Sequence, residues 1–151
     1  MKLVASFTMA VAGTCMLATP ALAQFAKPED AVKYRQSALY VMGQHFGRIG
    51  AMVNNKAPYD AKAALDNAEV VAEMAKLPWA GFAANTENLS RKAKAEIWTE
   101  QAKFKEHNEK LVAETAKLLA AAKTDNLDNL KVAFNSTAST CKACHDGFQN
   151  K

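Results

Sequence analysis

One short motif, Cys141-Lys142-Ala143-Cys144-His145, carries the clearest chemistry in this sequence. Its C-x-x-C-H spacing is that of c-type haem attachment. In such a site the two thiols add to the two vinyl groups of a haem, and the adjacent histidine brings an imidazole nitrogen to one face of the iron. The spacing therefore predicts one covalently attached haem c, with Cys141 and Cys144 as the thioether residues and His145 as the iron ligand.

Other uses of a closely spaced cysteine pair fit this sequence less well. A small disulfide does not account for the histidine that follows the pair directly. A thioredoxin-like C-x-x-C stands at the start of a helix in a βαβ unit, and no strand pattern lies near this one. A structural zinc site needs further Cys or His ligands, and only His45 and His107 are available, far apart in the sequence.

Residues 1–23 have the pattern of a secretory signal peptide. A short positive start precedes an uncharged, mostly apolar run, and Ala21-Leu22-Ala23 is an A-x-A cleavage site. The apolar run is too short to favour a membrane span, so no membrane insertion is expected. Cys15 follows a threonine rather than the small residue that precedes a lipoprotein cysteine. We therefore expect cleavage before Gln24, a periplasmic protein and one domain over residues 24–151.

The composition of the 151 residues favours a single helical domain. Half of the residues are hydrophobic and 23% are charged, which excludes a disordered chain. Six glycines and four prolines are few for an all-β fold. The net charge is only +4, and no basic cluster is interleaved with aromatic residues, so nucleic-acid binding is not expected.

Four segments have apolar residues at helical spacing, and these segments must position the motif. The first runs from Pro28 to near Asn54-Asn55, and the second from a cap by Asp60 to before Pro78. The third runs from about Arg91 to Lys123, and the fourth begins at a cap by Thr124-Asp125. Residues 79–90 are predicted to form a loop. In the third segment an apolar residue recurs every seven positions, at Ile97, Phe104, Leu111 and Leu118.

The last segment places both cysteines on its buried face. Spacings of three and four residues connect Leu127 to Phe148 through Cys141 and Cys144, and His145 lies on a neighbouring face. Four such segments joined by short turns predict an all-α, antiparallel up-down four-helix bundle that holds the haem between its helices. Since little chain follows His145, a group on the opposite face of the haem must come from upstream.

Several stretches resemble the cytochrome c′ (class II cytochrome c) family over essentially the whole predicted mature chain. They are residues 24–36, 77–79, 96–98 and 141–145. The resemblance implies a high-spin, five-coordinate haem bound through His145, and a homodimer. It implies that Leu39 covers the open face, that Arg35 and Gln36 lie against the haem and its propionates, and that the loop with Arg91 and Lys92 touches a propionate.

Two positions qualify what the resemblance implies. Many family members place Arg or Lys four residues after the haem histidine, where this chain has Gln149, so the charge near that face differs. Met42 lies one helical turn from Leu39 and is expected to fill the core, although it is also the plausible source of a sixth ligand. His45 and His107 are expected at the surface or at its boundary.

The function predicted first is a periplasmic haem protein that binds NO or CO and can transfer electrons to or from an unidentified redox partner. The alternative is a six-coordinate, low-spin class II cytochrome that acts purely as an electron carrier, with Met42 as the sixth ligand. An enzyme is not expected, because a haem peroxidase needs an acid or base over the open face and the Leu39 stripe has none.

Overall fold

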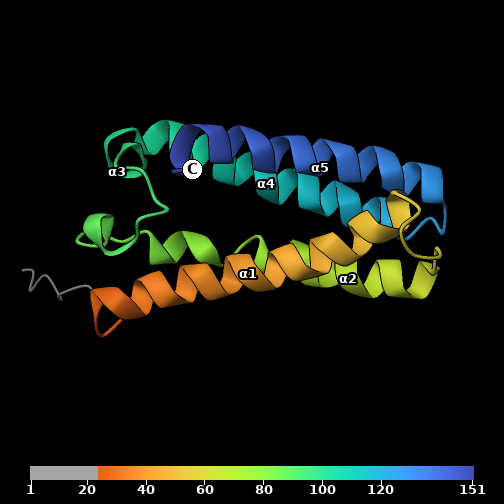
Figure 1. The fold of residues 1–151 in the computed structure, drawn as a ribbon, viewed down its shortest axis with the longest axis horizontal. Coiled ribbons are helices and arrows are strands. Elements are labelled where there is room, and N and C mark those ends of the chain that lie inside the picture. Colours follow the sequence, from red (N-terminus) through yellow and green to blue (C-terminus); the bar gives the residue numbers. More distant parts are fainter. Residues whose placement is uncertain (1–23) are drawn as a thin grey trace, which may run out of the picture.

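The computed structural model describes residues 24–151, and the predicted signal peptide lies outside the described residues. Within that range the chain is helical, and its one β-type pairing is an isolated bridge between Ala93 and Gln149. The long helices are α1 (Pro28–Val53), α2 (Ala61–Met74), α4 (Gln101–Ala122) and α5 (Leu127–Phe148); the short ones are η1 (Pro78–Gly81), η2 (Glu87–Leu89) and α3 (Glu96–Thr99). The predicted all-α four-helix bundle is therefore confirmed (Figure 1).

The long helices form two layers, with α1 beside α2 and α4 beside α5 (Figure 1). Small residues form much of the buried face of α2, where Ala64 and Ala68 are completely buried, as is Ala75 directly after the helix. Small side chains allow the two helix backbones to approach closely. Between the layers, the ring of Phe46 in α1 stacks on Phe134 in α5 with the centroids 4.3 Å apart.

The third predicted helix begins later than expected, because α4 starts at Gln101 and not at about Arg91. Residues 92–94 instead form an extended strap that pairs with residues 148–150. The backbone nitrogen of Lys94 donates to the carbonyl of Phe148 at 3.1 Å, and that of Asn150 donates to the carbonyl of Lys92 at 3.0 Å. Backbone groups that are used in this pairing are not available to a helix.

Two predicted helix boundaries also change. The predicted cap at Thr124-Asp125 is wrong, because Asp125 has a φ of 48° whereas an N-cap residue needs extended backbone. Asn126 has that backbone, and its side chain accepts a hydrogen bond from the nitrogen of Asn129 at 3.0 Å. Pro78 does not end α2 directly, since α2 stops at Met74 and Pro78 opens η1. The predicted cap by Asp60 is confirmed.

Candidate haem site

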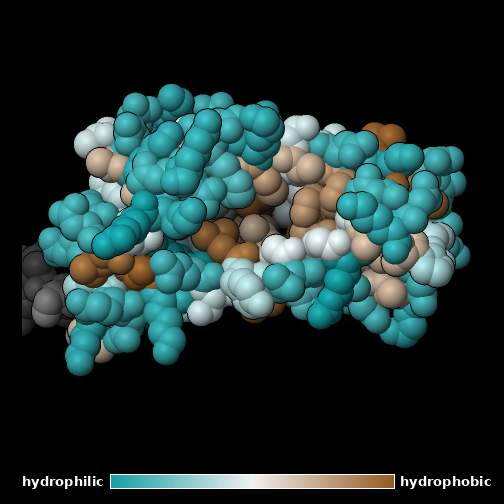
Figure 2. All heavy atoms as spheres, viewed as in Figure 1, coloured by the Kyte–Doolittle hydropathy of each residue, from teal (hydrophilic) through white to brown (hydrophobic). Residues whose placement is uncertain are grey.

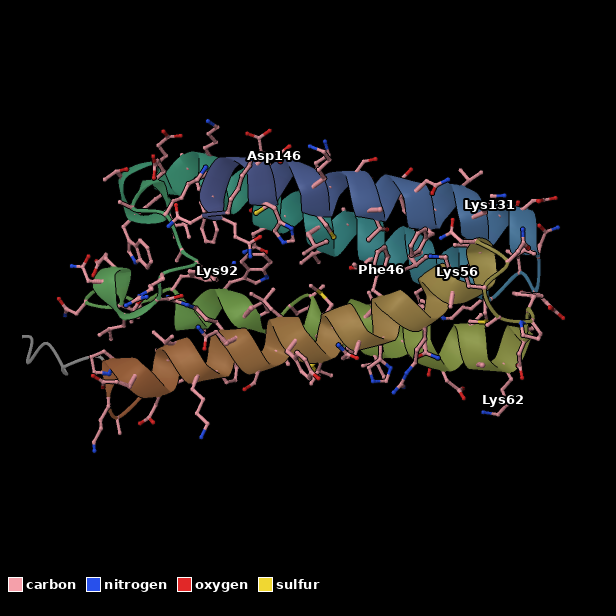
Figure 3. All side chains as sticks on the ribbon, in the orientation of Figure 1. Phe46, Lys56, Lys62, Lys92, Lys131 and Asp146 are labelled. Carbon is pink, nitrogen blue, oxygen red and sulfur yellow. The ribbon has the colours of Figure 1, made fainter. Side chains whose placement is uncertain are left out.

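A cavity of about 950 Å³ lies between the two layers of the bundle. Its volume is within the range of about 300–1,000 Å³ that is usual for ligand and cofactor sites. Figure 2 shows apolar side chains inside a hollow on this face of the molecule. Lys92 and Phe46, which both line the cavity, lie in the region between the layers (Figure 3). The position of the cavity lets residues of α1, α4 and α5 face one another.

Helix α5 brings both cysteines of the motif to the cavity wall. Cys141 and Cys144 continue the inward stripe of this helix, but they are half-buried rather than buried because they face the cavity. Both thiols are free. Burial raises the pKa of Cys141, and burial together with the charge of Cys141 raises the pKa of Cys144 to about 11. Both sulfurs are therefore protonated thiols near neutral pH.

His145 follows directly on α5 and also lines the cavity. Its side chain is exposed, in agreement with its expected place on a face next to the buried stripe. The imidazole and the two thiols thus reach the same cavity from consecutive turns of one helix. This arrangement fits a haem whose edge is held by the thiols and whose iron is approached by the imidazole.

The opposite wall of the cavity is apolar and comes from α1. Leu39, Met42 and Phe46 line it, and Met42 is only 9% exposed. They recur at three and four residues, so they lie on one face of the helix. Trp79 and Phe82, from η1 and the residue after it, complete this side. The structure therefore places Leu39 across the cavity from the helix that carries His145.

Arg35 reaches the cavity lining, but its guanidinium is bound to the loop after α2. Its Nη1 donates to the carbonyl of Gly81 and to Oγ1 of Thr86, both at 2.8 Å, and its Cζ lies 4.5 Å from the centroid of the Phe82 ring. The residue is 2% exposed, although an arginine on an amphipathic helix is usually solvated. Burial lowers the pKa of Arg35 while the charge of Glu87 raises it, and a guanidinium keeps its charge in proteins.

The backbone near Gly81 explains why the Arg35 guanidinium can reach this loop. A Cβ at Gly81 would lie 2.6 Å from the carbonyl oxygen of Ala31 and 2.7 Å from Cβ of Arg35. Glycine thus allows the loop backbone to touch α1 directly. Arg35 therefore fixes residues 81–86 on α1 and so fixes part of the wall of the cavity.

The remaining predicted residues lie at the rim of the cavity or away from it. Gln36 lines the cavity, and its Nε2 donates to Oγ of Ser90 at 3.5 Å. Lys92 also lines it from the strap and is exposed. Arg91 is exposed and is not part of the lining, because the chain there turns to pair with the end of α5; its carbonyl accepts from Nδ2 of Asn150.

Two groups of lining residues were not predicted as site residues. The first is a set of aromatic rings packed edge to face, in which Phe104 contacts Trp79, Phe82 and Phe148. The second is His107, which was expected at the surface or its boundary but lines the cavity with a fully buried Nδ1. The sequence contains a signal for it, because His107 lies three residues after Phe104 and four before Leu111, on the same face of the helix.

Comparison with known proteins places the chain in a family. Residues 30–149 match the family described as Cytochrome C′. The chain is 48% identical over 128 residues to the cytochrome c′ of Alcaligenes xylosoxydans xylosoxydans. The alignment covers 85% of this chain and 99% of that relative. The crystal structure of cytochrome c′ from Rubrivivax gelatinosus superposes with a TM-score of 0.81 at 42% identity and covers 84% of this chain and 100% of that chain.

A second similar structure contains nitric oxide. It is a nitric oxide complex of a variant of cytochrome c prime from Alcaligenes xylosoxidans. It superposes with a TM-score of 0.79 at 46% identity, over 85% of this chain and 99% of that chain.

Proposed function

Because this chain belongs to the cytochrome c′ family, we propose that it is a periplasmic protein that binds nitric oxide or carbon monoxide at its haem and also transfers electrons. Its cofactor is the covalently bound c-type haem of the family. We assign the thioether bonds to Cys141 and Cys144 and the iron ligand to His145. Residues 1–23 act as the cleaved signal peptide, and residues 24–151 form the haem domain.

The observation that carries this proposal is the chemical difference between the two walls of the cavity. The α5 wall provides the imidazole of His145, whereas the α1 wall provides Leu39, Met42 and Phe46. An iron held from one side only is five-coordinate and high-spin, and its free face is available to a small ligand. The nitric oxide complex of the Alcaligenes relative supports the same use of the site.

The apolar α1 wall also favours some diatomic ligands over others. Bound oxygen carries partial negative charge and is stabilised by a hydrogen-bond donor, whereas CO and NO depend less on one. Leu39 and Phe46 have no donor, the guanidinium of Arg35 is occupied by Gly81 and Thr86, and the amide of Gln36 donates to Ser90. We therefore expect the site to bind NO and CO in preference to oxygen.

A six-coordinate electron carrier is the second candidate function, and the position of Met42 favours it. Met42 lines the cavity from α1 and has a thioether that can ligate iron. Against this, Met42 is buried in the hydrophobic core with Ile49 and Val71, where it has a packing role. We assign Met42 to the core and the cover of the free face to Leu39.

Two further expectations belong to the proposed function. The protein is expected to be a binding and electron-transfer protein rather than an enzyme, with a redox partner that the sequence does not identify. It is expected to form a homodimer, which sedimentation equilibrium can measure. Within residues 24–151, no helix is long and apolar enough to cross a membrane.

The visible spectrum of the purified ferrous protein, with and without NO, tests the proposal. A five-coordinate site gives one broad visible band, and addition of NO changes the spectrum. Sharp, split bands that NO does not alter would favour the six-coordinate carrier instead.

A further inference from the structure

One buried polar atom of the cavity wall has no partner within the chain. Among residues 24–151, Nδ1 of His107 is the single buried side-chain nitrogen or oxygen without a hydrogen bond. Such an unpaired atom lowers the stability of the fold, because it has lost its hydrogen bonds to water and gained none in the protein. Native structures rarely keep that cost without a reason, and His107 lines the same cavity as the haem-attachment motif.

The aromatic rings beside His107 hold its imidazole in a defined orientation. The edge-to-face contact with Phe148 has a centroid distance of 5.6 Å and an angle of 79°. Phe104, one turn earlier on α4, packs on the same ring at 5.2 Å. The orientation of the imidazole is therefore set by packing, which leaves Nδ1 ready for a specific partner.

The register of α4 against α5 places His107 beside the motif. Oγ1 of Thr137 donates to the carbonyl of Glu114 at 3.3 Å, which fixes one point of the antiparallel pairing. His107 lies two turns before Glu114 on α4. Cys144 lies two turns after Thr137 on α5, and Phe148 follows one turn later. His107 and His145 therefore lie at the same level of the bundle, on the two helices that form one wall.

The hydroxyl groups that line the cavity from α4 and α5 do not compete with His107 for a hydrogen-bond partner, because they are bonded within their own helices. Those of Thr115, Thr137 and Thr140 each donate to a backbone carbonyl of their own helix. By contrast, no side-chain hydrogen bond formed within residues 24–151 involves the imidazole of His145. Histidines that ligate a metal almost always donate their second ring N–H to an acceptor.

We propose that, when His145 binds the haem iron, Nδ1 of His107 accepts a hydrogen bond from the ring N–H of His145 that points away from the iron; without the haem, Nδ1 is unpaired. His107 is thereby a positioning residue for the iron ligand. The inference rests on the proposed function, because it requires His145 to bind the haem iron. A neutral imidazole with its proton on Nε2 presents Nδ1 as an acceptor, and such an acceptor makes the ligating histidine more basic.

The test uses the ferrous holoprotein and two physical readouts, the iron–histidine stretching band in resonance Raman spectra and the reduction potential. His107→Leu and His107→Phe remove the acceptor, and both are expected to fold because each puts an apolar side chain of similar size against the ring of Phe148. Each should lower the stretching frequency and raise the potential. His107→Asn, with an amide oxygen near the position of Nδ1, should keep both close to the wild-type values.

His45→Leu is the matched control. His45 is a half-buried histidine on α1 that is hydrogen-bonded to Asn67 at 2.9 Å and is not part of the cavity lining, so both readouts should stay unchanged. Unchanged readouts in both acceptor-free variants of His107 would overturn the inference. A shift in Gln149→Leu, with none in the His107 variants, would also overturn it and make Gln149 the acceptor. Absence of an iron–histidine band in the wild type would overturn the proposed function itself.

Discussion

Replacement of Arg35 by methionine is expected to destabilise the bundle strongly. The substitution keeps most of the length of the side chain and removes the guanidinium. Two short hydrogen bonds, to the carbonyl of Gly81 and to Oγ1 of Thr86, are lost together with the contacts to the rings of Phe82 and Trp98. The carbonyl of Gly81, a buried residue, then has no donor from Arg35.

The size of the effect follows from these contacts. Hydrogen bonds to charged groups contribute about 1.5–3 kcal/mol each, and a desolvated cation–π contact contributes about 1–2 kcal/mol. With the lower values for the two hydrogen bonds and the two ring contacts, we expect the free energy of unfolding to fall by about 5 kcal/mol. Domains of this size have about 5–15 kcal/mol in total, so the loss is a large share of the stability.

Chemical denaturation of the holoprotein, followed by far-ultraviolet circular dichroism, measures this loss. Arg48→Met is the matched control, since Arg48 is an exposed arginine on the same helix, and it should change the stability by less than about 0.5 kcal/mol. Arg35→Lys keeps the charge but not the planar fork, and an intermediate loss is expected. Equal stabilities of Arg35→Met and Arg48→Met would refute the role assigned to Arg35.

Three further predictions concern the haem. Replacement of both Cys141 and Cys144 by serine should give a protein without covalent haem. Intact-mass analysis of the wild type should show the mature chain plus one haem, and a wild-type mass equal to the bare polypeptide would contradict the assignment. Leu39→Ala should tighten CO binding about tenfold if displacement of the leucine opposes ligand entry by about 1.4 kcal/mol; equal affinities in a CO titration of two well-folded proteins would mean that another residue guards the iron. Met42→Leu conserves volume, so it should cost less than about 1.5 kcal/mol and leave the ferrous spectrum unchanged; conversion of sharp bands to one broad band would make Met42 the sixth ligand.

Periodic patterns in the sequence were sufficient to predict the helices and much of their buried surface. The row Ile97, Phe104, Leu111 and Leu118 faces inward throughout, even though Ile97 belongs to α3 and the other three to α4. Such a row predicts which face is buried, but it does not predict where the backbone stays helical. The start of α4 was missed because the strap pairs with residues 148–150, a contact between distant parts of the chain.

The role of Arg35 depends on groups that no local pattern reveals. An arginine on the flank of an amphipathic helix is usually solvated. Here it is buried because Gly81 lets a loop backbone approach α1 and because Thr86 supplies an acceptor. His107 is a different case, since its spacing from Phe104 placed it on the inward row, and only the general exposure of histidines argued against it.

The order of the elements along the chain gives the final helix a particular part in maturation. A polypeptide is made from its N-terminus, so the walls that contain Leu39, Trp79 and His107 are synthesised before the thiols of α5. Until α5 arrives, α4 lacks the helix that its inward row packs against, and the earlier helices carry apolar surface without cover. A chain interrupted before Cys141 would therefore contain most of the cavity wall but neither the two thiols nor the histidine that we assign to the haem.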